Sequence, residues 1–222
     1  MRLYIDTASE ETVREYRSSG VIDGVTTNPS LVASTDVSYR ATIERLSEAI
    51  DGPVFAQVIA DDVEGMVAEG RAYDSWGPDV IVKIPATPAG YEALERLRAE
   101  GIEAGITVVF SIAQAVLAAK NDATFVAPYV GRLEDAGEDG IDVVTGMQET
   151  FDAYGFETEL LAASVRTRAQ ATKLYRAGVD AVTLPPETLE AQFHHHKTAE
   201  GIAGFDDDWG DRSSPVADRS GE

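Results

Sequence analysis

The sequence predicts an α/β fold, a (β/α)8 TIM barrel with a C-terminal helix. Short apolar runs that suit strands alternate eight times with longer helical patterns, which is typical of parallel strands joined by crossover helices. Each strand–helix unit takes about 28 residues, so eight units account for most of the 222-residue chain. An open doubly wound sheet is the alternative, but no G-x-G-x-x-G motif follows the first strand, which argues against a dinucleotide site.

Each predicted element rests on its own local pattern. The predicted strands are Arg2–Ile5, Asp23–Thr26, Val54–Val58, Val80–Ile84, Ala104–Val108, Thr124–Ala127, Glu159–Ala163 and Ala181–Leu184. The predicted helices between them are Glu10–Ser18, Ser38–Ile50, Asp62–Ser75, Pro88–Ala99, Ser111–Ala119, Gly140–Tyr154 and Arg168–Ala177. Ser9 is the expected N-cap of the first helix, and Gly178 marks the expected end of the last of them.

The chain shows no linker that would divide it into several domains. We expect residues 1–205 to form a single barrel domain that includes its C-terminal helix. After Phe205 the composition changes to acidic and small polar residues. We therefore expect residues 206–222 to form an acidic, mostly disordered tail.

The composition is strongly acidic, with 39 Asp and Glu residues against 18 Lys and Arg residues and a net charge of −21. A surface of this charge repels nucleic acid and anionic membranes, so we expect neither as a partner. A carboxylate-rich, lysine-poor surface is typical of cytoplasms with very high salt, where self-repulsion is screened. The composition therefore predicts a halophilic protein.

Two further features limit the chemistry and the location. The chain has no cysteine, which excludes disulfides, zinc–thiolate sites and thiol nucleophiles. No apolar run approaches the roughly 18 residues of a membrane span. The first residues, MRLYIDTASE, are typical of a strand that leads into a helix and not of a signal peptide, so we expect a cytoplasmic protein.

Polar side chains gather at the carboxyl ends of the predicted strands, where (β/α)8 barrels build their active sites. Seven of the eight strands end in at least one reactive or hydrogen-bonding side chain. These residues are Asp6, Thr26, Thr27, Asn28, Gln57, Lys83, Thr107, Tyr129, Arg132, Ser164 and Arg166. Their common position, more than any one of them, predicts a single site.

Lys83 lies in the apolar stretch VIVKIP, although the chain has only four lysines. Side chains alternate along a strand, so Ile81 and Lys83 share one face. If this face points into the barrel, burial lowers the pKa of Lys83 and provides the neutral amine that forms a Schiff base with a carbonyl. The alternative is a lysine paired with a carboxylate. Asp6 suits either case, as an ion-pair partner or as a proton shuttle.

Arg132, Ser164 and Arg166 suit a phosphate group. A guanidinium presents a planar fork of donors that matches phosphate oxygens, and a serine hydroxyl adds one more contact. The three residues follow the sixth and seventh predicted strands, near where barrels often bind phosphate. The alternative is that the arginines pair with some of the many surface carboxylates.

The run His194–His196 is the one candidate metal site in the sequence. Adjacent residues on a helix point about 100° apart, so three in a row cannot share one ion well. We therefore expect a solvated or capping role for these histidines, and no bound metal.

Taken together, these segments resemble the small transaldolase and fructose-6-phosphate aldolase family of class I aldolases. The resemblance extends over residues 2–209 with no large insertion. Its motifs are YIDTA, DGVTTNPSL, FAQVIA, VIVKIPATPAG, FSIAQAVLAA, APYVGRLEDAGEDG, LAASVRT, VTLPPETL and a final H-x-x-T-x-x-G-x-x-x-F-x-x-D-W. The order and spacing of TTNPS and VKIP are highly specific.

The resemblance implies Schiff-base catalysis on a sugar phosphate in a (β/α)8 barrel, with no metal or other cofactor. By this resemblance Lys83 is the Schiff-base lysine, Asp6 is the acid/base group beside it, and Thr26 and Asn28 belong to the substrate-binding side. The phosphate-binding positions match Arg132, Ser164 and Arg166. Small members of the family form pentamers that stack into decamers with exchanged C-terminal helices, which implies a homo-oligomer.

Within the family, two positions separate aldolases from transaldolases. Fructose-6-phosphate aldolases carry glutamine and tyrosine where this chain has Gln57 and Tyr129, and with a threonine, here Thr107, these residues orient the catalytic water. Transaldolases carry glutamate and phenylalanine. The chain departs from the aldolases at Arg166, where they have lysine, and from the transaldolases at Gly105, where they have asparagine.

The sequence therefore predicts a class I aldolase that cleaves or forms the C3–C4 bond of a ketose phosphate and releases a ketone such as dihydroxyacetone. One alternative is a transaldolase, which holds the enamine for an acceptor aldehyde. A second is a metal-dependent aldolase or isomerase that uses the histidines. A non-catalytic sugar-phosphate binding protein is the alternative of another class.

Overall fold

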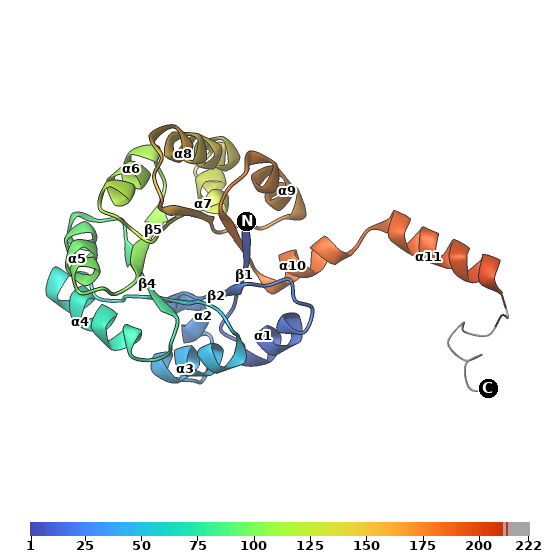
Figure 1. Ribbon diagram of the computed structural model, residues 1–222, viewed down its shortest axis with the longest axis horizontal. Coiled ribbons are helices and arrows are strands. Elements are labelled where there is room, and N and C mark those ends of the chain that lie inside the picture. Colours follow the sequence, from blue (N-terminus) through green and yellow to red (C-terminus); the bar gives the residue numbers. More distant parts are fainter. Residues whose placement is uncertain (211, 213–222) are drawn as a thin grey trace. The chain divides into compact units, whose positions relative to one another are not determined.

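Eight parallel strands close into a barrel, which confirms the predicted fold class. The computed structural model describes residues 1–210 and residue 212. The strands are β1 (Arg2–Asp6), β2 (Gly24–Thr26), β3 (Val54–Gln57), β4 (Val80–Pro85), β5 (Ala104–Val109), β6 (Phe125–Pro128), β7 (Glu159–Ala162) and β8 (Ala181–Leu184). Each strand pairs with the next, and β8 pairs with β1, so the sheet has no open edge (Figure 1).

Helices follow the strands and ring the outside of the sheet (Figure 1). The helices of the ring are α1 (Glu10–Arg17), α2 (Pro29–Ala33), α3 (Tyr39–Ala49), α4 (Val63–Asp74), α5 (Pro88–Ala99), α6 (Ile112–Lys120), α7 (Val130–Asp135), α8 (Gly140–Tyr154) and α9 (Arg168–Ala177), and β8 is followed in the chain by α10 (Pro186–Phe193) and α11 (His196–Trp209). The bounds of α5, α8 and α9 are those that the sequence predicts. The short helices α2 and α7 were not predicted, because each occupies a loop beyond a strand end.

Local hydrogen bonds explain where the predicted helices begin and end. The Ser9 side chain accepts a hydrogen bond from the backbone N–H of Thr12, which confirms it as the N-cap of α1. Helix α9 begins with a capping box between Thr167 and Gln170. It ends at Gly178, whose φ of 76° is in the left-handed region that glycine adopts without strain.

Two separate apolar layers hold the barrel together. The outer layer lies between sheet and helices and includes Val82 and Ile84 of β4. The inner layer fills the barrel with Tyr4, Phe55, Ile81, Phe125, Ala127, Leu161, Ala163 and Ala181. Since Ile81 is in the inner layer, strand alternation places Lys83 inside the barrel as well, one step closer to the carboxyl ends of the strands. The condition on which the sequence argument for Lys83 depended is therefore met.

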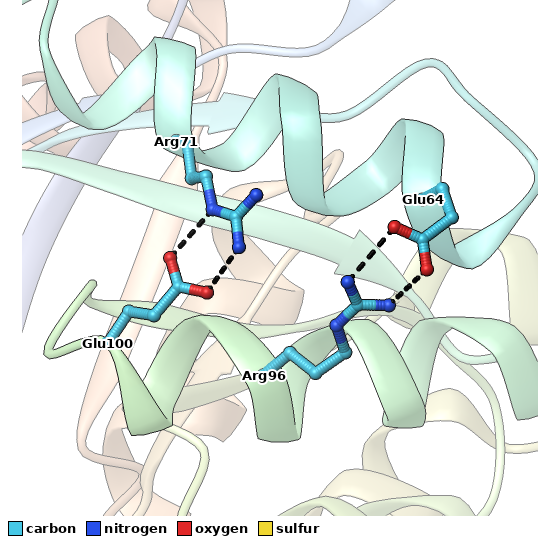
Figure 2. Close-up of polar contacts among 4 residues, drawn as sticks. All are labelled: Glu64, Arg71, Arg96 and Glu100. Atoms are coloured by element: carbon cyan, nitrogen blue, oxygen red, sulfur yellow. Dashed lines mark hydrogen bonds and ion pairs between the residues drawn. The ribbon is translucent and has the colours of Figure 1, made fainter.

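Ion pairs link neighbouring helices on the surface, and Figure 2 shows two of them between α4 and α5. Arg71 binds the Glu100 carboxylate through two hydrogen bonds of 2.7 and 2.5 Å. Arg96 binds Glu64 in the same way, with distances of 2.5 and 3.0 Å. Because Glu64, Arg71 and Glu100 are exposed and Arg96 is partly exposed, salt screens these pairs and their contribution to stability is small.

The chain divides into two compact units, Met1–Leu189 and Glu190–Glu222, and the barrel belongs to the first. In the second unit, Nδ1 of His195 accepts a 3.1 Å hydrogen bond from the backbone N–H of Lys197 and so caps α11, one of the roles expected for the histidine run. Residues 206–209 of the expected disordered tail are the last residues of α11. The rest of that predicted tail, except residues 210 and 212, lies outside the described residues.

Within the described part of the chain, no helix combines the length and the apolar character that spanning a membrane requires.

Candidate active site

A cavity of about 340 Å³ opens at the carboxyl ends of the barrel strands. It is lined by nine of the residues that the sequence predicts for the site: Asp6, Thr26, Asn28, Gln57, Lys83, Thr107, Tyr129, Arg132 and Ser164. These residues come from seven different strand ends, which meet because the parallel strands of a closed barrel all point the same way. Thr27 and Arg166, which the sequence also places at strand ends, do not line the cavity.

Lys83 reaches this cavity from β4 and is 5% exposed. Its Nζ donates a 2.5 Å hydrogen bond to the backbone carbonyl of Thr27. Within residues 1–210 and 212, Nζ forms no ion pair with a carboxylate, so the contact ion pair considered as the alternative is not observed. Burial lowers the pKa of Lys83 from 10.5 to about 8, and the charge of Asp6 opposes that shift. About one tenth of the amine is therefore neutral at pH 7, far more than for an exposed lysine.

Asp6 ends β1 and takes part in a chain of hydroxyl hydrogen bonds. Thr26 Oγ1 donates to Asp6 Oδ1 over 2.7 Å, and Thr26 Oγ1 lies 2.6 Å from Thr183 Oγ1. The Thr26 hydroxyl has one proton and gives it to Asp6, so Thr183 is the donor in the second bond. Burial raises the pKa of Asp6, while Lys83 and the Thr26 hydrogen bond lower it. Such a carboxylate can accept a proton more readily than an exposed one.

Sequence reasoning missed Thr183, although the motif VTLPPETL contains it. The eighth strand was the one for which no polar end residue was named. Thr183 lies within β8 and not beyond its end, so a search limited to strand ends overlooks it. Its side chain lines the same cavity.

Gln57, Thr107 and Tyr129 lie on the cavity wall with polar atoms available to a small ligand. Thr107 Oγ1 donates to the Tyr129 hydroxyl over 3.2 Å. Gln57 Oε1 is buried and has no hydrogen-bond partner among the described residues. A buried carbonyl oxygen without a partner is costly, so this atom suits a bound water or a substrate hydroxyl. The Gln57 backbone is fixed, because Tyr39 Oη bonds both its N–H and its C=O.

A β-bulge explains why two consecutive residues of β5 line the cavity. The register of β5 against β6 shifts between Thr107 and Val109. Val108 between them has a φ of 59°, which is rare for a β-branched residue. This conformation turns Val108 toward the same cavity as Thr107, against the usual alternation. Strain of this kind is often found at functional sites.

Asn28 combines a structural and a ligand-facing position. Its Oδ1 accepts hydrogen bonds of 3.1 Å from the backbone N–H groups of Ser30 and Leu31, which caps α2. Pro29 occupies the first turn, where no N–H is needed. Because Oδ1 is used by the cap, the Nδ2 amide group is the part of Asn28 that remains for a ligand in the cavity.

The two arginines predicted to bind phosphate differ in their surroundings. Arg132 lines the cavity, and its guanidinium lies 5.0 Å from the centre of the Tyr129 ring. The Arg166 guanidinium instead forms a bidentate ion pair with Asp135, with distances of 2.7 and 2.6 Å. For Arg166, therefore, the pairing with a carboxylate that the sequence left open is the one observed. Asp135 was not singled out from the sequence.

The described residues contain no group of three or more histidine, aspartate or glutamate side chains arranged to hold a metal ion.

Comparison with known proteins decides the family. The profile described as Transaldolase/Fructose-6-phosphate aldolase matches residues 3–215, nearly the whole chain.

The chain belongs to the transaldolase and fructose-6-phosphate aldolase family.

Members of this family with similar sequences include proteins named probable transaldolase. One from Kosmotoga olearia is 44% identical over 209 residues, covering 94% of this chain and 96% of its own length. Another from Methanococcus maripaludis is 43% identical over 209 residues, covering 94% of this chain and 97% of its own length. Family membership confirms the prediction of an aldolase-type or transaldolase-type enzyme.

Solved structures with a similar fold are more distant. Thiamine phosphate pyrophosphorylase from Pyrococcus furiosus is 16% identical, with a TM-score of 0.57 over 83% of this chain and 85% of that protein. A mandelate oxidase mutant is 13% identical, with the same TM-score over 83% of this chain and 63% of that protein. At these identities the likeness concerns the barrel fold alone.

The structure gives a physical reason for one departure from the transaldolase pattern of the family. Gly105 pairs with Lys83 across β4 and β5. A Cβ atom at Gly105 would lie 2.3 Å from the Phe125 carbonyl oxygen and 2.4 Å from its ring. No larger side chain fits at this position unless Phe125 moves, so an asparagine here is incompatible with the observed packing of β5 against β6.

Proposed function

We propose that this family member is a class I aldolase that acts on ketose phosphates through a Schiff base on Lys83. The observation that carries the proposal is the position of Lys83, which is buried at the cavity with its pKa lowered to about 8. A lysine amine must lose its proton before it can attack a carbonyl, and desolvation in an apolar barrel favours this form. The covalent intermediate makes a separate cofactor unnecessary.

In the proposed reaction, Nζ of Lys83 attacks the C2 carbonyl of the ketose, and loss of water gives an iminium ion. The Asp6 carboxylate takes the proton of the C4 hydroxyl, the C3–C4 bond breaks, and its electron pair moves into the iminium to form an enamine. The aldehyde leaves with the phosphate. Protonation of the enamine at C3 and hydrolysis then release a ketone such as dihydroxyacetone and regenerate the amine.

The proton that reaches the enamine is proposed to come from a water between Gln57, Thr107 and Tyr129. Three features support this role: the unpartnered Gln57 Oε1, the 3.2 Å bond from Thr107 to Tyr129, and the position of all three at the cavity. An amide and two hydroxyls can orient a water by donating and accepting hydrogen bonds. Arg132 and Ser164 are proposed to hold the phosphate, and Asn28 a substrate hydroxyl.

Covalent trapping tests the proposal directly. Borohydride reduction in the presence of dihydroxyacetone should add the ligand to Lys83, and Lys83→Met should abolish both the adduct and turnover without unfolding the protein. Mapping of the adduct to Lys120, Lys173 or Lys197 contradicts the assignment. If the protein binds a sugar phosphate but yields no adduct, the non-catalytic binding protein is the correct interpretation.

Transaldolase activity is the second candidate, and the names of the similar proteins favour it. A transaldolase retains the enamine until an acceptor aldehyde arrives, whereas an aldolase protonates it. The decisive assay measures free ketone from ketose phosphates in molar salt, with and without an acceptor aldehyde. Release of ketone without acceptor supports the aldolase, and turnover only with acceptor supports the transaldolase. Running the assay on several ketose phosphates would also distinguish pentose phosphate from hexose phosphate substrates.

We also propose a homo-oligomer, a pentamer or decamer, in which α11 packs against another copy. Ile202, Phe205 and Trp209 are large apolar residues of α11, and they are 56%, 73% and 46% exposed. Their spacing places them on one face of a helix, as expected for a packing surface. Sedimentation of the wild type against Phe205→Asp tests this: the substitution should lower the oligomer mass.

We further propose that the enzyme is halophilic and cytoplasmic. Its net charge of −21 supports the halophilic character.

A further inference from the structure

Arg166 forms an ion pair with Asp135 outside the cavity. Nη1 of Arg166 donates to Oδ1 of Asp135 over 2.7 Å, and Nη2 donates to Oδ2 over 2.6 Å. The cavity is lined by Arg132 and Ser164 but not by Arg166. Asp135 is the last residue of α7, the same helix that carries Arg132. A carboxylate therefore occupies the guanidinium edge that would otherwise bind an anion.

The backbone and the stem of Arg166 are held in place by contacts that do not involve Asp135. Its backbone N–H donates to Gln170 Oε1 over 2.7 Å, and Thr188 Oγ1 donates to its carbonyl over 3.1 Å. A Cβ atom at Gly131 would lie 2.6 Å from Arg166 Nε, so the side chain runs directly against Gly131. A change of partner thus involves rotation of the guanidinium and no movement of the loop that carries it.

The charges near Ser164 do not match a phosphate ester while the ion pair exists. A phosphate monoester carries a charge of about −1.5 to −2 near neutral pH. Arg132 and Arg166 together would balance it, but the Asp135 carboxylate cancels the charge of Arg166. Carboxylate and phosphate both accept the bidentate fork of a guanidinium, so they compete for the same donors. Both partners are about half exposed, at 49% and 58%, so exchange is not blocked by burial.

We propose that Asp135 determines specificity: its carboxylate competes with the substrate phosphate for Arg166 and so reduces the preference for phosphorylated over unphosphorylated ketoses. This inference rests on the proposed function, because it assigns the phosphate of the substrate to the Arg132 and Ser164 end of the cavity. Asp135 touches no reacting atom and acts through Arg166.

The test compares Asp135→Asn with Glu138→Gln, a control that removes the same charge from the segment just after α7. The Glu138 side chain is exposed and forms no hydrogen bond or ion pair among the described residues. The dissociation constant of inorganic phosphate is measured by calorimetry in one fixed salt buffer, and the KM for fructose 6-phosphate is measured beside it. The rate of borohydride trapping of dihydroxyacetone, which has no phosphate, is the third measurement.

Asp135→Asn should lower the phosphate dissociation constant and the KM by about two- to fivefold, the range expected of one exposed ion pair. Its dihydroxyacetone trapping rate should equal that of the wild type, and Glu138→Gln should change none of the three values. An unchanged or higher dissociation constant in Asp135→Asn overturns the proposal, as does an equal fall in Glu138→Gln. Absence of any lysine adduct refutes the proposed function instead, while the calorimetric comparison still decides the role of Asp135.

Discussion

Asp6→Asn should move the pH dependence of Schiff-base formation at Lys83 to lower pH. Burial lowers the pKa of Lys83 from 10.5 to about 8, and the negative charge of Asp6 limits that shift. An asparagine has nearly the same size and still offers Thr26 an acceptor oxygen, but it carries no charge. The ammonium form of Lys83 then loses its stabilising neighbour while it remains buried, so its pKa should fall further.

The size of the effect follows from the neutral fraction of the amine. With a pKa of about 8, about one tenth of Lys83 is neutral at pH 7, against roughly one in three thousand for an exposed lysine. Loss of one nearby opposite charge lowers a lysine pKa by about one unit or more. At pH 7 the neutral fraction should therefore rise about fivefold, from roughly one tenth to one half.

The assay follows covalent labelling of Lys83 by dihydroxyacetone and cyanoborohydride at constant salt, between about pH 6 and pH 10. The initial rate should rise with pH and reach half of its maximum near pH 8 in the wild type, and near pH 7 in Asp6→Asn. The midpoint is the readout, because the loss of Asp6 as a proton carrier also lowers the overall rate. Glu187→Gln is the control, since Glu187 affects the pKa of Asp6 but not that of Lys83.

Two results would refute the reasoning. A wild-type midpoint close to 10.5 would mean that Lys83 is not desolvated as its 5% exposure requires. A midpoint that stays constant or rises in Asp6→Asn would mean that the carboxylate does not act on the lysine through its charge.

Further predictions concern proton transfer and salt. The double variant Gln57→Glu, Tyr129→Phe should shift the fate of the enamine from protonation toward transfer to an acceptor by roughly tenfold, because the water that protonates it loses contacts worth about 0.5–1.5 kcal/mol each. The ratio of transfer product to free ketone in the presence of an acceptor aldehyde measures this shift. An unchanged ratio would mean that this water does not protonate the enamine. The midpoint temperature of thermal unfolding should decrease when the salt is diluted from molar to about 0.1 M, because the net charge of −21 is then screened less. A constant midpoint would contradict the halophilic assignment. Arg71→Gln, which breaks the pair with Glu100 in Figure 2, should lower that midpoint slightly in low salt and have no effect in molar salt.

The barrel and most of the cavity residues could be predicted from the amino-acid sequence alone. Each strand was visible as a short apolar run, and the bounds of β8 are those predicted. Polar residues at the ends of seven of the eight runs could be assigned to one site without coordinates, since all strands of a parallel barrel end at the same face. Alternation along β4 put Lys83 on the same face as Ile81, and the structure shows that this face points into the barrel.

The pairing of the polar groups, in contrast, became clear from the three-dimensional fold. Thr183 is 157 residues from Thr26 in the chain, and Asp135 is 31 residues from Arg166. Strand periodicity says which face a side chain occupies, but it does not say which distant side chain meets it there. Likewise the bulge at Val108 depends on how β5 pairs with β6, a relation that the local pattern of β5 does not contain.

The burial that activates Lys83 is a further property of the whole barrel. Its pKa falls because the strands close around the amine and exclude water, and it stops near 8 because Asp6 arrives from another strand. Sequence patterns fix the chemical groups and the faces they occupy, because these depend on neighbours along the chain. Distances, partners and desolvation depend on neighbours in space, so they are properties of the closed eight-stranded barrel and not of any local stretch of sequence.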